Sequence, residues 1–280
     1  MSLPGTVDAP ARRAISWGLV PAVLVCGAAI LLFGLQVTLP GYALLVTGVG
    51  IAYLLDRSGR TEGLARDLLL IAIGQAIVST ISVEADISYG NMALMGTVLA
   101  LAVAVPYVIS RYVYRDHAIR FPWRTGKRWT RVQWTYLIGV TFVGWLVLPF
   151  YFITSGVYRN WPTVTEFDEF ARLFVGVNAV GTWDELFFIC TIFALLRRHF
   201  PVWQANLLQT IVFVSFLWEL GYQSWGPLLT IPFALIQGYT FTLTKSLTYV
   251  LTVHLLFDLV VFLVIVYAHN GWPPIFLLAP

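Results

Sequence analysis

Five ionisable side chains lie inside apolar stretches of the sequence, where a buried or membrane-spanning helix is expected. Asp184 and Glu185 are adjacent, Glu219 lies near the end of a second stretch, and His254 and Asp258 lie in a third. A carboxylate at the centre of a membrane helix costs about 2.5–3.5 kcal/mol. Because no lysine or arginine lies near them, metal coordination, shared protons or a water-filled cavity must make their burial tolerable.

The spacing of these residues indicates what chemistry they can do. Residues four apart share a helix face, so His254 and Asp258 can bind one metal, or the carboxylate can orient the imidazole. Asp184 and Glu185 point about 100° apart, so one can face a cavity while the other pairs elsewhere. A purely structural alternative is that His254 and Asp258 fix helix packing and Glu219 reaches the interface. Adjacent acids inside an apolar span have no packing value, so we interpret the five residues as a functional cluster.

The composition requires that helices in a membrane position this cluster. Of the 280 residues, 59% are hydrophobic and only 11% are charged, against roughly 25% in a soluble domain. A mean hydropathy of +0.79 excludes a soluble or disordered chain, and a net charge of +3 gives no reason to expect a nucleic-acid partner. Cys26 and Cys190 both lie in apolar stretches, which excludes a disulfide framework. The predicted fold class is therefore an all-α, polytopic membrane protein.

Nine apolar stretches approach the roughly 20 residues that cross the hydrocarbon core, and two of them are short. We therefore expect about 8–9 transmembrane helices. The stretches are residues 15–36, 40–55, 67–83, 91–112, 134–155, 170–196, 203–221, 228–244 and 246–268.

The basic residues orient these spans, because cytoplasmic connections collect positive charge. Of the 17 basic residues, 15 fall in alternate connections, and only Arg159 and Arg172 fall on the other side. This pattern predicts a cytoplasmic N-terminus, preceded by Arg12 and Arg13, and an outer C-terminus. The basic loop of residues 111–131 either binds anionic lipid or is an ordinary stop signal, and we favour the stop signal.

The chain divides at this loop into two predicted regions. Residues 1–130 comprise an N-terminal four-span membrane region and the basic cytoplasmic loop. Residues 131–280 comprise a five-span membrane region that carries all five candidate residues.

Three short motifs in the second region resemble the CPBP family of intramembrane metalloproteases, which includes type II CAAX prenyl proteases and bacteriocin-processing or self-immunity proteins. The family motifs are EExxxR, FxxxH and HxxxN or HxxxD. They correspond to the run from Asp184 to Ile189, to Phe213 or Phe216 leading to Glu219, and to the run from His254 to Asp258. The similarity covers about residues 170–268 and includes the run from Gln237 to His254.

The resemblance implies a membrane hydrolase, most simply a metal-dependent peptidase. Asp184 or Glu185 would activate water. Glu219, His254 and Asp258 would bind a divalent metal such as zinc, manganese or iron, or would hold the oxyanion. The substrate would be a peptide or lipidated protein at the lipid bilayer, and the location a cell membrane, with the bacterial plasma membrane as our expectation.

Departures from the family motifs keep two alternatives open. Asp184 replaces the first glutamate, Ile189 replaces the arginine, and Glu219 replaces the histidine of the second motif. A catalytically altered protein of the same fold, with a binding, immunity or assembly role, fits these changes. A proton- or cation-coupled transporter also uses buried acids, but the nine spans show no two-fold repeat.

Overall fold

The computed structural model describes residues 17–123 and 128–280, and every regular element in these residues is a helix. The predicted all-α class is therefore confirmed. Four of the basic residues used to orient the spans, Arg12, Arg13, Arg124 and Lys127, lie outside the described residues.

Nine helical segments, several of them built from consecutive α- and π-helical pieces, follow one another in the described chain. Each overlaps one of the nine predicted stretches. They are α1 with η1 (Leu19–Ala29, Ile30–Gly34), α2 (Thr38–Arg57), α3 (Leu64–Val78), α4 with η2 (Tyr89–Val108, Ile109–Val113), α5 (Arg131–Ser155), α6 with η4 and α7 (Phe167–Asp184, Glu185–Phe193, Ala194–Leu196), α8 (Val202–Leu220), α9 (Pro227–Thr244) and α10 (Leu247–Asn270). A single 3₁₀ turn, η3 (Val157–Asn160), lies between α5 and α6.

Five of these segments are long and apolar enough to cross a membrane: α2, α4 with η2, α5, α6 through α7, and α10. The segment of α1 and η1 is apolar but shorter. Helix α8 is less apolar because it buries amide side chains against α9: Asn206 donates to the Leu235 carbonyl at 2.7 Å, and Gln209 to the Ala234 carbonyl at 3.1 Å. The structure thus supports a multi-pass membrane protein, while nine full spans and their orientation stay predictions.

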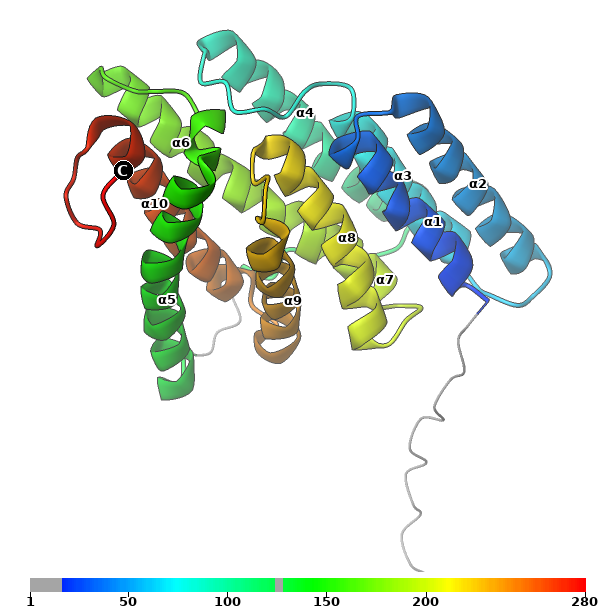
Figure 1. The fold of residues 1–280 in the computed structure, drawn as a ribbon. Helices are drawn as coiled ribbons and strands as arrows, with labels where there is room; N and C mark the ends of the chain where they lie inside the picture. The colour runs from blue at the N-terminus through cyan, green and yellow to red at the C-terminus, as the bar shows by residue number, and fades with distance from the viewer. Residues whose placement is uncertain (1–16, 124–127) are drawn as a thin grey trace, which may run out of the picture.

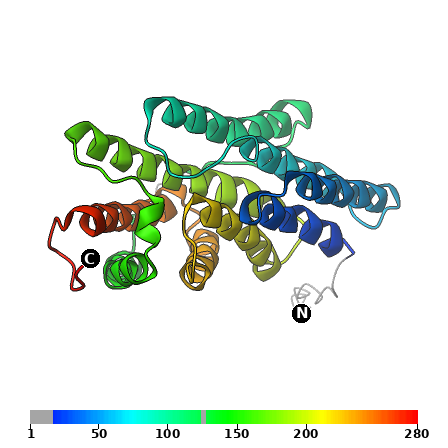
Figure 2. The ribbon, with the colours of Figure 1, turned by 45° about the horizontal axis from the view of Figure 1, so that its top comes forward.

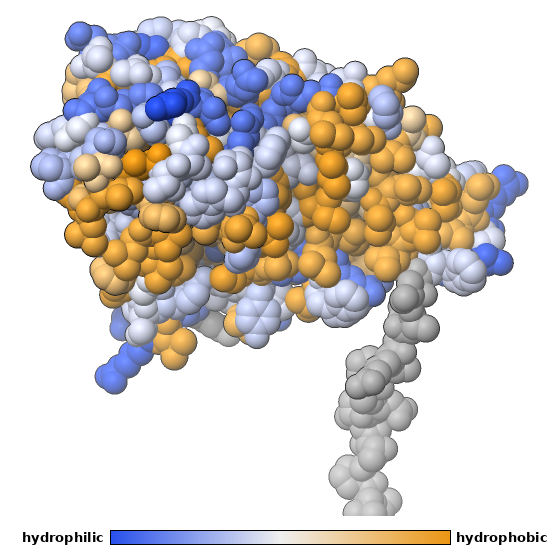
Figure 3. Space-filling model, viewed as in Figure 1, coloured by the Kyte–Doolittle hydropathy of each residue, from blue (hydrophilic) through white to orange (hydrophobic). Residues whose placement is uncertain are grey.

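The surface has the composition that a surrounding bilayer requires. Figure 3 shows a broad band of apolar residues across the visible face, with hydrophilic residues gathered mainly above it and at its edges. Large apolar side chains on the outer helices are freely exposed, among them Leu39, Val46, Val132 and Ile138. In water such an extended apolar surface would drive association, so it is typical of a lipid-facing protein.

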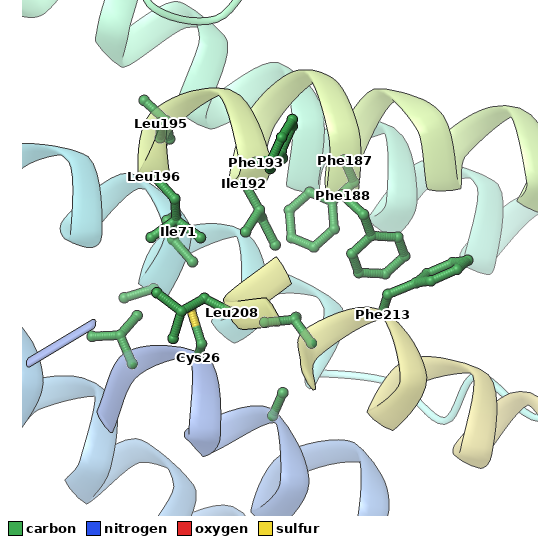
Figure 4. Close-up of a cluster of buried hydrophobic side chains, with 14 of the residues drawn as sticks. Cys26, Ile71, Phe187, Phe188, Ile192, Phe193, Leu195, Leu196, Leu208 and Phe213 are labelled. Atoms are coloured by element: carbon green, nitrogen blue, oxygen red, sulfur yellow. The ribbon is translucent and has the colours of Figure 1, made fainter. Parts of the chain in front are cut away.

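The helix that carries Asp184 and Glu185 lies in the middle of the molecule. Figures 1 and 2 show α6 and its continuation running between α4 on one side and α8 and α10 on the other. In Figure 4, Ile192 and Leu196 point toward α1, α3 and α8. The residues of the same apolar cluster on those helices include Cys26, Ile71 and Leu208. Trp183 adds a bond from its indole nitrogen to the Leu99 carbonyl of α4, at 2.7 Å. This packing fixes the two acids in position.

Local sequence signals set the limits of α10, which carries His254 and Asp258. The Ser246 side chain accepts a hydrogen bond from the Tyr249 backbone N–H, which caps the first turn. Gly271, with φ of 68°, ends the helix in the left-handed conformation that glycine adopts without strain. Helix α10 packs against both α5 and α6, so its polar face is directed toward Asp184 and Glu185.

Candidate active site

The helix changes its hydrogen-bonding pattern at the adjacent acids. Helix α6 ends at Asp184, and the π-helix η4 begins at Glu185. The Thr191 hydroxyl donates to the carbonyl of Leu186, five residues earlier, at 2.9 Å. A π-helical turn holds one more residue than an α-helical turn, and such turns occur frequently at functional sites. The wider π-helical turn therefore begins at the two adjacent acids, Asp184 and Glu185.

Four of the five predicted residues come together around the imidazole of His254. Its Nδ1 lies 2.8 Å from Glu185 Oε1. Its Nε2 lies 3.6 Å from Asp184 Oδ2 and 3.8 Å from Asp258 Oδ1. All four side chains are buried, with residue exposures from 2% to 6%. One ring nitrogen thus has a single close carboxylate partner, and the other faces two carboxylates at longer range.

Gln237 of α9 completes this cluster, and sequence reasoning did not single it out. Its Nε2 donates to Glu185 Oε1 at 2.8 Å and to the Val250 carbonyl at 3.2 Å. Glu185 therefore accepts two hydrogen bonds on one oxygen, from His254 and Gln237. The available signal was that Gln237 is the only glutamine of α9 and directly follows the apolar run from Phe233 to Ile236.

A cavity of about 560 Å³ opens beside the cluster. Asp184, Gln237, His254 and Asp258 line it, whereas Glu185 lies behind them. The remaining lining is largely apolar and comes from α4, α5, α6, α9, α10 and the loops at their ends. One acid thus faces a cavity while its neighbour pairs elsewhere, as their helical angle predicts.

Four buried oxygens of the cluster have no hydrogen-bond partner: Asp184 Oδ1, Glu185 Oε2, Gln237 Oε1 and Asp258 Oδ2. Buried polar atoms are normally satisfied, so unpaired acceptors around one cavity indicate a place where water or a substrate donor binds. Asp258 Oδ2 also packs closely on Gly181, where a Cβ atom would lie only 1.8 Å away.

The comparison with protein families assigns this part of the chain. Residues 166–260 match the family described as type II CAAX prenyl endopeptidase Rce1-like. Residues 166–260 are a CPBP-family domain. The Rce1-like domain extends from the start of α6 into α10 and contains all five predicted residues. The resemblance seen in the three motifs is thereby confirmed. No curated protein and no solved structure matched the chain.

Within the Rce1-like domain, Glu219 does not join the cluster. Its Oε1 accepts a hydrogen bond from the backbone N–H of Val83, at 3.3 Å, in the connection between α3 and α4. Of the predicted metal ligands, the structure brings together only His254 and Asp258. Among residues 17–123 and 128–280, no group of three or more His, Cys, Asp or Glu side chains is arranged to hold a metal ion. The predicted donor set, as it lies, does not fit a metal.

Ile189 of the Rce1-like domain is also buried, at 3% exposure, and its apolar side chain offers nothing to a carboxylate. The sequence therefore left the motif-one acids without an evident partner. The structure supplies this partner from α9 and α10, because Gln237 and His254 hold Glu185.

Tyr222 of the Rce1-like domain is a further cavity residue that the sequence did not indicate. It lies just after α8, lines the cavity, and packs its ring edge-on against Phe152 and Trp161. Burial raises the pKa of its hydroxyl well above the ordinary value, and the nearby Asp258 raises that pKa further. The hydroxyl therefore stays protonated and can donate a hydrogen bond into the cavity.

Proposed function

We propose that the protein is an intramembrane hydrolase, most simply a peptidase, in which His254 activates the attacking water. The arrangement of His254 carries the proposal: Glu185 on Nδ1, and Asp184 and Asp258 facing Nε2 at the wall of a largely apolar cavity. A histidine oriented on one nitrogen by a carboxylate is the usual form of a general base.

Glu185 and Gln237 act as positioning residues in this mechanism. When Glu185 accepts the proton of His254 Nδ1–H as a hydrogen bond, Nε2 is left free to take a proton from water. Gln237 holds the Glu185 carboxylate in the orientation that this bond needs. Two donors on one oxygen make Glu185 a poor general base, so its part is to orient the imidazole.

Asp184 and Asp258 face the same ring nitrogen from the cavity side. Their distances from Nε2, 3.6 and 3.8 Å, are too long for direct hydrogen bonds, so Nε2 can bind a water in the cavity that all three side chains line. A water held there donates one proton to Nε2 while its oxygen attacks the substrate carbonyl carbon. The two carboxylates stabilise the imidazolium that forms, and Tyr222 donates to the developing oxyanion.

The imidazolium then returns its proton to the leaving nitrogen as the carbon–nitrogen bond breaks, which gives a free carboxyl group and an amine. No step uses a metal. The predicted zinc, manganese or iron stays a prediction, which elemental analysis of the purified protein tests.

The cavity supports a substrate with an apolar part that is cleaved at the membrane. Its lining combines an apolar surface with one polar cluster, so a lipidated or strongly apolar peptide fits better than a hydrophilic one. The CPBP-family domain supports the same substrate class, since its family is named for prenyl endopeptidases.

A comparison of Asp184→Asn with a neutral neighbour tests this function. The protein in lipid nanodiscs is given a quenched fluorogenic peptide, with and without a prenyl group. We expect wild-type cleavage to favour the lipidated peptide. Asp184→Asn should lower cleavage by about 10²-fold, because it removes a negative charge that stabilises the imidazolium. The control is Leu259→Ala, since Leu259 lies on α10 beside Asp258 but is 38% exposed. Equal rates in Asp184→Asn and wild type would exclude the role of Asp184.

A binding role without catalysis is the second candidate, because Ile189 and Glu219 stand at motif positions that the family fills differently. This candidate requires that Asp184→Asn keep full function in cells. Four buried ionisable groups facing one another count against it, because a scaffold gains nothing from that cost.

A further inference from the structure

The connection between α3 and α4, residues 79–88, contributes to the wall of the candidate active-site cavity. This connection contains no helix, yet Val83 is fully buried, and Ala85, Asp86 and Ile87 line the cavity. It belongs to the N-terminal region, outside residues 166–260. A wall of the candidate active site is therefore supplied from outside the Rce1-like domain.

Two charged side chains of the Rce1-like domain hold this connection. Glu219 of α8, 7% exposed, accepts from the Val83 backbone N–H at 3.3 Å. Arg172 of α6 donates from Nη1 to the Ile87 backbone carbonyl at 2.6 Å. Glu219 thus binds the connection at Val83, just before its cavity-lining residues. Arg172 binds it at Ile87, the last of these residues.

Both anchors bind backbone groups of a segment that contains no helix. A buried backbone N–H outside a helix must find an acceptor, and Glu219 is the acceptor for Val83. Arg172 is fixed in turn by a 2.8 Å ion pair with Asp168 and by the ring of Tyr89, 4.6 Å from its guanidinium carbon. A charge-assisted hydrogen bond is about twice as strong as a neutral one, which suits an anchor for irregular backbone.

We propose that Glu219 and Arg172 are positioning residues that hold residues 79–88 as the outer wall of the cavity, so that this wall determines which substrates reach His254. Glu219 then has a reason to be a buried acid without being a metal ligand. The selection of substrates by this wall rests on the proposed hydrolase function. The role of Glu219 and Arg172 in holding the wall does not depend on that function.

Thiol labelling tests the wall without any assay of activity. Thr182 lines the cavity, so Thr182→Cys places a reporter there, while the natural Cys26 and Cys190 are fully buried. In this background we expect Glu219→Ala and Arg172→Ala each to speed reaction with a bulky, charged maleimide at least fivefold. Glu219→Gln keeps an acceptor oxygen and Arg172→Lys keeps a donor, so both are expected to label at close to the parent rate.

Ser215→Ala is the matched control on α8. Ser215 lies one turn before Glu219 and bonds only to the Ile211 carbonyl of its own helix. Circular dichroism identifies any variant that does not fold. Because the two anchors lie on different helices, labelling of one alanine variant still tests the proposal if the other variant does not fold. Labelling of both alanine variants at the parent rate would overturn the proposal.

Cleavage of two substrates provides the second arm. In Glu219→Ala we expect kcat/KM for a peptide with a bulky group next to the scissile bond to rise relative to that for a small one. If wild type cleaves neither peptide, the hydrolase proposal fails while the labelling result still decides the wall. If wild type cleaves both peptides and the ratio of their kcat/KM values is the same in Glu219→Ala, the wall does not select substrates.

Discussion

His254 has a different environment at each ring nitrogen, and this asymmetry gives the cluster its chemistry. Glu185 is within direct hydrogen-bond distance of Nδ1, while two carboxylates face Nε2 from beyond that distance. A symmetric environment would leave the position of the ring proton undefined. In the tautomer that donates from Nδ1 to the closer carboxylate, the opposite nitrogen is available to accept a proton.

At the same scale, Gln237 provides a prediction. Gln237→Leu removes the second hydrogen bond to Glu185 Oε1 without adding a charge. A hydrogen bond to a charged group contributes about 1.5–3 kcal/mol, so we expect kcat to fall roughly 10–100-fold while KM changes little. Steady-state kinetics on the lipidated peptide measure both constants. Thr242→Ala, on the same helix but bonded only to Gly238 of that helix, serves as the control. An effect on KM alone would contradict a positioning role.

The sequence predicted the candidate residues because burying a charged side chain costs free energy, so a charge inside an apolar stretch indicates a special role. That cost marked Asp184, Glu185, His254 and Asp258, and the structure brings these four together. The same cost marked Glu219, but it does not say which neighbour offsets the burial. The partner is a backbone N–H 136 residues away. Gln237 was missed because an amide in an apolar stretch carries a much weaker signal than a charge.

Close contact between α6 and α10 is the feature of the elements that assembles the site. The contact depends on Gly181, since Asp258 Oδ2 occupies the space that a side chain there would need. The sequence predicted both helices from their apolar runs. It did not predict that the helix would become π-helical at Glu185, because a π-turn depends on packing and not on composition.

Two glycine substitutions on α6 test the importance of this contact. Gly181→Ala places a Cβ atom 1.8 Å from Asp258 Oδ2, so the helices must separate or Asp258 must move. We expect a lower Tm and a loss of hydrolysis of at least tenfold. Gly176→Ala meets no atom within 4 Å and removes a helix-weakening glycine, so its Tm should be unchanged or higher. The contact is unimportant if both variants behave alike in thermal unfolding and in the hydrolysis assay.

At the scale of the whole molecule, polar contacts join segments that lie far apart in the sequence. At the end predicted to be cytoplasmic, Arg198 pairs with Asp67 at 3.0 Å and with Asp116 at 2.7 Å. At the opposite end, the Asn160 amide donates to the Gly221 carbonyl at 2.8 Å, beside the anchors of residues 79–88. The number of spans, their alternation in direction and their orientation in a membrane stay predictions.

The division of the chain at residue 130 stays a prediction, and packing contacts cross it. The CPBP-family domain does lie in the second region. However, α1 packs on α8, α4 packs on η4, and residues 79–88 close the cavity. Hydropathy cannot reveal these contacts, because apolar helices carry no mark of the neighbour against which they pack. Helix α4 and residues 85–87 of the N-terminal region are therefore part of the wall of this cavity.

Cleavage in ¹⁸O-labelled water tests most directly whether His254 activates water for hydrolysis. Wild-type protein in nanodiscs is given a lipidated peptide, and mass spectrometry follows the new carboxyl group. We expect one ¹⁸O atom per cleaved bond, and at least a 10²-fold slower release of this product by His254→Ala, with Leu259→Ala close to wild type. Release of the labelled product by His254→Ala at the wild-type rate would contradict the central role of His254.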